Sequence, residues 1–167
     1  MTMWTASIAL VGLALAIVIA HAVVTAPIAL RLTRIDVPID GLSPGLEGYS
    51  LAILSDLHYG GTIAPSRLLS HAVHLANDAA PDLIVLLGDY ALSHSRFPTL
   101  SRWLYEWALP PMTAPLHTLR APDGVIAILG NHDYDYDAAK VAAWLRSLGA
   151  RVLVNECITV HRGDALL

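Results

Sequence analysis

Three apolar segments of this chain each end in polar side chains that could do chemistry. The sequence reads YSLAIL-SDLH, DLIVLL-GDY and VIAIL-GNHD, so carboxylate, imidazole or amide groups follow each apolar run at once. The candidate residues in these ends are Asp56, His58, Asp89, Asn131, His132 and Asp133. An aspartate in a single turn has an ordinary explanation, because Asp favours turns and helix caps. Three such ends in succession indicate a shared reaction centre.

The side-chain types in these ends suit divalent metal ions. Carboxylate oxygen, imidazole nitrogen and amide oxygen are ligands for Zn, Mn or Fe, and the single cysteine, Cys157, lies elsewhere in the chain. Two such ions about 3.5–4 Å apart can bind both the attacking and the leaving oxygen when a group is displaced at phosphorus. A metal-bound water also becomes a nucleophile near neutral pH. Gly88 and Gly130 lie in two of the ends, where a glycine allows close backbone approach or positive φ. The pattern favours metal-assisted chemistry at phosphorus.

Alternating strands and helices are expected to position these ends. The expected strands cover residues 35–39, 49–54, 82–87 and 125–129, and the expected helices cover residues 66–78, 100–107, 113–119 and 138–148. This order is typical of an α/β protein, a layered sheet flanked by helices. Long apolar runs such as DLIVLL suit strands covered on both faces. Because ligands bind beyond the carboxyl ends of the strands in such sheets, the three polar ends should lie at one edge.

Several details of these elements are also predicted. Trp103 and Trp107 recur at helical spacing with two leucines, which favours core packing; contact with a bilayer is the alternative. Pro110 and the proline after it should end that helix. The segments RVLV and CITVH look like a hairpin pair, followed by a turn at 162–164. Asp137 is expected to cap the helix that follows it, and Gly149 to end that helix.

The first 30 residues differ in composition from the rest. No Asp, Glu, Lys or Arg precedes Arg31, and residues 4–25 are apolar over about the 20 residues that a membrane span needs. We expect residues 1–30 to be an uncleaved transmembrane anchor, because a signal peptide would begin with a basic region. A signal peptide cleaved near AHA (20–22) is the alternative.

Charge and composition bound the remaining function classes. The net charge of −4 offers no basic stripe, so no nucleic-acid partner is expected. Arg31 and Arg34 would place the domain that follows the anchor on the cytoplasmic side of the membrane. Residues 31–48 are then a linker with a first strand, and residues 49–167 form the catalytic domain.

The ends SDLH, GDY and GNHD, in this order and after apolar strands, resemble the calcineurin-like metallophosphoesterases. The spacings of these ends fit the family as well. Asp89 follows Asp56 by 33 positions (89 − 56 = 33), and Asn131 follows Asp89 by 42 positions (131 − 89 = 42). The apolar N-terminus followed by IDVPIDGL and LEGYSLAILSDLHYG looks like the membrane-associated bacterial branch, which includes enzymes of a UDP-diacylglucosamine pyrophosphatase type. The resemblance covers about residues 35–167.

This resemblance implies the fold of that family and the hydrolysis of a phosphate ester or pyrophosphate bond by a centre of two divalent metal ions. The substrate would be a phosphorylated small molecule or a lipid-linked compound at the membrane. The implied metal ligands are Asp56, His58, Asp89 and Asn131. Of these, Asp89 would bridge both ions. His132 would donate a proton to the leaving oxygen or stabilise phosphoryl charge, and Asp133 would orient His132. His94, in a loop at the same edge, could contact the substrate phosphate.

The family pattern continues beyond GNHD with a lone histidine and a GHxH-type segment. After His132 this sequence contains only His161, which lies in an expected hairpin strand and is not expected to be a ligand. We therefore expect the N-terminal portion of such a domain, with weak metal binding and little hydrolysis by this chain alone. The alternatives are a non-catalytic membrane scaffold or remnant, or one half of a split enzyme.

Overall fold

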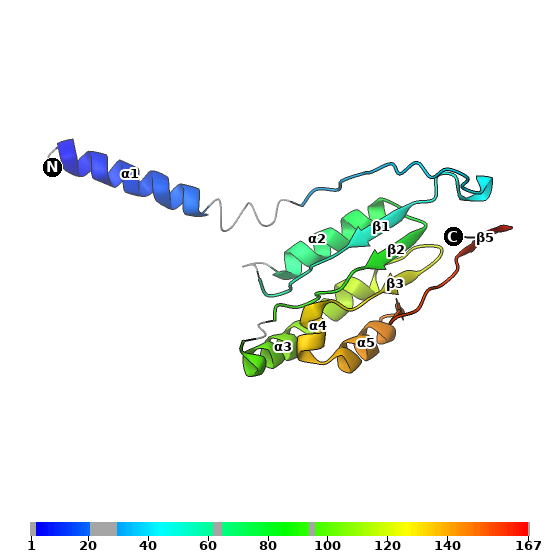
Figure 1. Cartoon of the computed structure of the whole chain (residues 1–167). Coiled ribbons are helices and arrows are strands. Elements are labelled where there is room, and N and C mark those ends of the chain that lie inside the picture. Colours follow the sequence, from blue (N-terminus) through cyan, green and yellow to red (C-terminus); the bar gives the residue numbers. More distant parts are fainter. Residues whose placement is uncertain (1–2, 21–29, 62–64, 94–95, 167) are drawn as a thin grey trace.

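The computed structural model describes residues 3–20, 30–61, 65–93 and 96–166 (Figure 1). In chain order the elements are α1 (Met3–Ala20), the 3-10 helix η3 (Pro44–Leu46), β1 (Leu51–Leu54), α2 (Pro65–Asp78), β2 (Leu83–Leu86), α3 (Pro98–His117), β3 (Val125–Ala127), α4 (Asn131–Tyr136), α5 (Ala138–Ser147), β4 (Arg151–Val152), β5 (His161–Arg162) and β6 (Ala165–Leu166).

The strands β1 to β4 form one sheet in the order β1-β2-β3-β4, and every neighbouring pair is parallel. Each parallel pair is joined by a crossover that contains one or two helices. Such crossovers are almost always right-handed, so steps that all move in one direction bring their helices to the same face. In Figure 1, α2 and α3 lie behind the strands. The predicted α/β class, with a parallel sheet and flanking helices, is confirmed.

The core lies between this face of the sheet and the helices. Side chains alternate between the two faces of a strand, so every second residue of β1 to β4 points toward the helices. The centre of the core comprises Ile84, Ala127, Tyr105, Val141 and Leu145, each 0% exposed. Burial of apolar area at about 25 cal/mol per Å² makes this layer the main source of stability.

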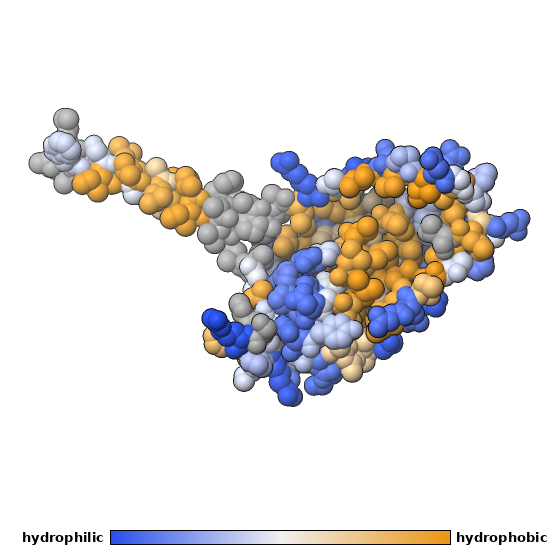
Figure 2. Space-filling model, in the orientation of Figure 1, coloured by the Kyte–Doolittle hydropathy of each residue, from blue (hydrophilic) through white to orange (hydrophobic). Residues whose placement is uncertain are grey.

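The opposite face of the sheet is apolar and exposed at its centre. Leu51 and Ile53 of β1 are 49% and 60% exposed, and Leu87 and Ile128 are exposed just beyond β2 and β3. Figure 2 shows an apolar patch where Figure 1 shows these strands in front. The expectation that both faces are covered is therefore wrong for the described residues, because the unidirectional strand order places the helices together.

Two predictions for the N-terminal part need correction. Within the described ranges, no helix is both long and apolar enough to cross a membrane, so the span expected over residues 4–25 is not found. The helix formed there, α1, has 18 residues, against the roughly 20 that a hydrocarbon core requires; residues 21–29 lie outside the described residues. Residues 35–39 form no strand, and their apolar side chains Ile35 and Val37 are exposed.

The helix expected to end at Pro110 instead runs on to His117 and absorbs the second short helix expected there. Its buried residues are Ser101, Tyr105, Ala108, Met112 and Leu116. Trp103 and Trp107 are 60% and 47% exposed, so their expected core position is wrong. Pro110 is exposed, and the spacing of the buried residues of α3 continues unbroken past it. Core packing on the buried face of α3 therefore outweighs the loss of the backbone hydrogen bond that proline removes on the exposed face.

The C-terminal hairpin also differs from the prediction. Arg151–Val152 pairs in parallel with β3, and the hairpin forms between β5 and β6 around the predicted turn. The predicted cap of α5 is confirmed, since Asp137 accepts a hydrogen bond from the Lys140 amide at 3.1 Å. Gly149 follows α5 with φ +88, and the Ala150 amide donates to the Leu145 carbonyl, which completes a Schellman ending.

Candidate metal centre

The three polar ends lie together at the carboxyl edge of the sheet, as predicted. Backbone hydrogen bonds join the first end to the second: the His58 amide donates to the Asp89 carbonyl at 3.0 Å, and the Asp56 amide donates to the Gly88 carbonyl at 3.2 Å. The His132 amide joins the third end to the second by donating to Asp89 Oδ1 at 2.9 Å. The parallel register of β1, β2 and β3 therefore delivers all three ends to one place.

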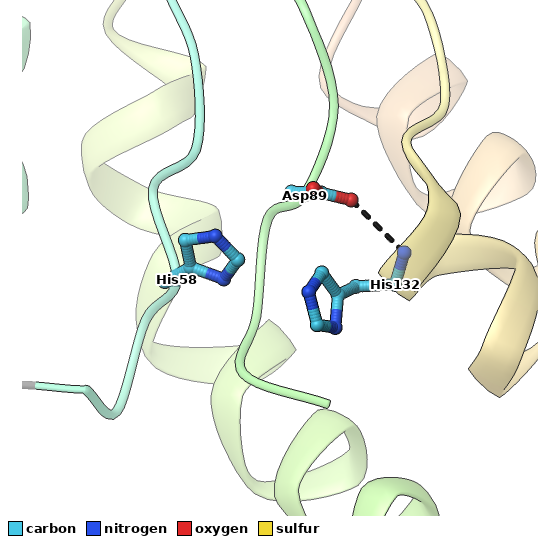
Figure 3. A group of neighbouring side chains, drawn as sticks. All are labelled: His58, Asp89 and His132. Carbon is cyan, nitrogen blue, oxygen red and sulfur yellow. Dashed lines mark hydrogen bonds between the residues drawn. The ribbon is translucent and has the colours of Figure 1, made fainter. Parts of the chain in front are cut away.

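Three side chains in these ends could hold a metal ion together. His58, Asp89 and His132 each offer one ligand atom, and these atoms lie within 4.8 Å of one another. The two imidazole rings are 4.9 Å apart between centroids and meet edge to face at 87°. Figure 3 shows the two rings side by side below the Asp89 carboxylate, with His58 coming from a loop and His132 from the start of α4. We call this group the His58–Asp89–His132 cluster.

The cluster fits a divalent ion by its own chemistry. The Nδ1 atoms of His58 and His132 are buried and have no hydrogen-bond partner among the described residues. A buried polar atom without a partner costs about 1–3 kcal/mol, so two on neighbouring rings are exceptional. A bound cation would satisfy both, because neutral imidazole is a common metal ligand. Two nitrogens and a carboxylate are a donor set for Zn, Mn or Fe.

The backbone at the candidate ligands adopts a conformation that side chains usually avoid. Asp56, His58 and Asp89 have φ of 52°, 38° and 55°, in the left-handed region. Each such residue costs about 1–3 kcal/mol, and strain of this kind gathers at functional sites. The amide-to-carbonyl bonds from the first end to the second hold Asp56 and His58 in this conformation.

Two glycines allow the second and third ends to approach. Gly88 has φ +92, and a Cβ built on it would lie 2.2 Å from the Gly130 nitrogen. A Cβ on Gly130 would lie 2.1 Å from Asp89 Oδ1. The predicted need for glycine at both positions is confirmed, because any side chain there would push the two loops apart.

Asp133 holds the loops together through its carboxylate and is 0% exposed. Oδ2 accepts from the amides of Gly130 at 2.7 Å and Asp89 at 2.9 Å. Oδ1 accepts from the Tyr105 hydroxyl at 2.7 Å and the Tyr90 amide at 3.2 Å. Burial, together with the Asp133 charge, raises the pKa of Tyr105 far above its ordinary value, which keeps the hydroxyl protonated as a donor.

The resemblance implied that Asp133 orients His132, and that role stays a prediction. The four hydrogen bonds of Asp133 run to backbone amides and a phenol, and within the described residues none runs to the His132 ring. Tyr105 is the participant that the sequence did not reveal. It lies 28 positions before Asp133 on a different helix, and no motif includes it.

The other predicted site residues lie around the cluster. Asp56 Oδ1 is 3.5 Å from His58 Nε2, and the Ser55 hydroxyl donates to Asp56 Oδ2. Asp56 is 62% exposed and lies outside the cluster. Asn131 is the first residue of α4 and is exposed. His94 lies outside the described residues.

His161 lies far from these residues, on β5. The neighbouring Arg162 pairs with Asp82, which precedes β2, so this hairpin lies near the amino edge of the sheet. His161 also lines a cavity with Asp123 and Gly124, which precede β3. Within the described residues, His161 is therefore separate from the His58–Asp89–His132 cluster.

Together these features define an α/β domain with imidazole and carboxylate groups at the carboxyl edge of a parallel sheet. The chain belongs to the calcineurin-like phosphoesterase family, which matches residues 49–163.

Three relatives illustrate the range of the family. The chain is 30% identical over 139 residues to the Bos taurus "Transmembrane protein with metallophosphoesterase domain", covering 80% of this chain and 29% of that protein. It is 30% identical to "Phosphodiesterase YaeI" of Escherichia coli, over 67% of this chain and 38% of the relative. It is 30% identical to "UDP-2,3-diacylglucosamine pyrophosphatase LpxG" of Chlamydia trachomatis, over 65% of this chain and 30% of the relative. The matched part is thus less than two fifths of each relative's length.

Proposed function

We propose that this domain hydrolyses phosphate ester or pyrophosphate bonds with the help of two divalent metal ions. The observation that supports this function is the convergence of the Asp89 carboxylate with two imidazoles whose buried Nδ1 atoms lack partners among the described residues. Ions held there would polarise a phosphoryl oxygen and lower the pKa of a water molecule. Mn, Zn and Fe all suit the donor set.

The residue roles follow from position in the cluster. Asp89 lies in the central one of the three ends and would contact both ions, while His58 and the nearby Asp56 would hold one of them. Asn131 would add an amide oxygen for the second. His132 would hold an ion through its ring or deliver a proton to the leaving oxygen from a ring nitrogen. In either case the backbone amide of His132 donates to Asp89 Oδ1, which fixes the backbone that carries the ring.

A lipid-linked substrate at a membrane is the more specific part of the proposal. One relative is named a UDP-2,3-diacylglucosamine pyrophosphatase, and another is named a transmembrane protein. The net charge of −4 gives no attraction for nucleic acid. The cytoplasmic orientation inferred from Arg31 and Arg34 stays a prediction, as do the domain limits at residues 30 and 48.

Metal stoichiometry and hydrolysis test the proposed reaction. The metal-stripped chain is titrated with Mn²⁺ or Zn²⁺, bound ions are counted per chain, and release of nitrophenol from bis-nitrophenyl phosphate is followed. Asp89→Asn keeps the shape of the side chain and removes its charge, so metal-dependent turnover should fall about 100-fold or more. Asp78→Asn is the matched control, since Asp78 is an exposed carboxylate at the end of α2. Turnover that survives in Asp89→Asn would refute the proposed site.

A non-catalytic scaffold is the second candidate. The exposed apolar face with Leu51, Ile53 and Leu87 supports it, because large apolar patches mark interaction surfaces. The same titration separates the two functions. Bound metal that depends on Asp89 favours the enzyme, and a folded chain that binds no ion favours the scaffold.

A further inference from the structure

Tyr105 places a phenol hydroxyl on the buried face of α3, which also contains the buried hydroxyl of Ser101. Tyr105 is 0% exposed, and the buried α3 residues that follow it, Ala108, Met112 and Leu116, have no hydroxyl. Burying a hydroxyl is costly unless it forms a hydrogen bond. Its hydroxyl donates to Asp133 Oδ1 at 2.7 Å, and its ring stacks on Tyr136 at 4.6 Å between centroids with planes 12° apart. The phenol is therefore held on both its polar and its aromatic side.

The acceptor of this bond holds the backbone of the cluster. The remaining bonds of the Asp133 carboxylate fix the amides of Asp89, Tyr90 and Gly130. Asp89 in turn receives the His132 amide on Oδ1. If the Asp133 carboxylate rotated, it would release the loop that contains Asp89. It would also release the start of α4, the helix that carries His132. Within the described residues, Tyr105 is the only side-chain donor among the four hydrogen-bond partners of this carboxylate.

We propose that Tyr105 is a positioning residue for the metal centre: its hydroxyl holds the Asp133 carboxylate, which sets the backbone of Asp89 and His132 and so the spacing of the cluster. The inference rests on the proposed function in that it takes the cluster as a metal site. It assigns to α3, which contributes no ligand to the cluster, an effect on how tightly the cluster binds an ion.

The test compares Mn²⁺ affinity among three variants of the whole chain by equilibrium dialysis. Tyr105→Phe removes the hydroxyl and keeps the ring stacked on Tyr136, and its Kd should rise about tenfold, within the range seen for partners of metal ligands. Tyr134→Phe is the matched control, because that tyrosine lies on α4 and is 58% exposed; its Kd should equal that of the wild type. On an Asp133→Asn background, Tyr105→Phe should add little further loss, as expected for residues that act as one unit.

The outcomes separate positioning from packing. A lower unfolding midpoint for metal-free Tyr105→Phe with unchanged Mn²⁺ affinity would make Tyr105 a core residue only and overturn the inference. Should Tyr105→Phe not fold, Tyr136→Leu takes its place. That variant frees the ring while leaving the hydroxyl, and its Kd should rise by a few fold; an unchanged Kd would equally refute positioning. Absence of Mn²⁺ binding by the wild-type chain would remove the metal site itself and the inference with it, a result visible without any variant.

Discussion

Gly88 and Gly130 approach so closely that a Cβ on the first would lie 2.2 Å from the nitrogen of the second. Gly130→Ala should therefore lower the free energy of unfolding by about 3 kcal/mol, because the new methyl group displaces the Asp89 carboxylate and its loop. Urea denaturation measures the change. Gly124→Ala is the comparison: Gly124 has φ +88, unlike Gly130 with φ −92, and nothing lies within 4 Å of the added Cβ, so only a backbone penalty of about 1 kcal/mol is expected. Equal costs for the two variants would contradict the close approach.

Removal of one imidazole should separate metal binding from folding. His58→Ala deletes a ring whose buried Nδ1 lacks a partner among the described residues, so the metal-free chain should lose little stability. The Kd of this variant for Zn²⁺ should rise by at least about 100-fold. Loss of a residue that only hydrogen-bonds to a metal ligand weakens binding by less than this. Thermal unfolding with and without Zn²⁺ measures both quantities, because a bound ion raises the midpoint. His117→Ala, an exposed histidine of α3, should retain the full metal-induced shift.

The buried phenol of Tyr105 should make the chain sensitive to alkali. Burial and the Asp133 charge raise its pKa in the folded state above the ordinary value of 10.0. Below pH 10 the phenol is protonated in both states, so its contribution is complete; above pH 10 the unfolded chain loses the proton first, and stability falls. Unfolding free energies between about pH 9 and 11 should decline less steeply in Tyr105→Phe. Identical slopes for variant and wild type would show that Tyr105 ionises normally.

At the amino edge of the sheet, Asp82 should make the chain sensitive to acid. It accepts from the Ser50 amide at 2.8 Å and the Ser50 hydroxyl at 2.9 Å, and it pairs with Arg162 at 3.0 Å. The backbone bond from Ser50, and after it the side-chain bond and the Arg162 charge, lower the pKa of Asp82 below 3.8. The stability it gives is present above pH 3.8 and is lost as the pH falls through the lower folded value.

Asp82→Asn should accordingly cost about 1 kcal/mol at pH 7, and this cost should shrink as the pH is lowered below 3.8. Urea unfolding at pH 7 and at an acid pH below 3.8 measures the difference. Asp36→Asn, in the exposed segment before η3, should match the wild type at both. A cost that persists at the lower pH would mean that the carboxylate charge is not what stabilises this edge.

The location of the site could be predicted from the sequence, but the orientation of Asp133 could not. Polar residues after three apolar strands must lie at one edge once the strands are parallel. The family resemblance implied that Asp133 orients His132. The sequence did not reveal that α4 begins at Asn131, so successive side chains there point about 100° apart. The carboxylate of Asp133 consequently faces the amides of the second end.

The face of α3 was misjudged for a related reason. Hydrophobic spacing favoured Trp103 and Trp107 as buried residues, yet Tyr105 lies inside. A tyrosine enters a core when its hydroxyl has an acceptor, and here the acceptor comes from a residue on another helix. Helical periodicity records how apolar a side chain is and contains no information about such a distant partner.

The strand order also bears on synthesis by the ribosome. Each strand of the sheet pairs with the strand made just before it, so every addition joins the newest segment to one already present. Chains fold from the N-terminus as they emerge, and pairing between neighbours in sequence keeps the loop to be closed short. All three residues of the His58–Asp89–His132 cluster precede α5 and β4. The cluster can therefore take shape on a nascent chain in which β4 has yet to be translated.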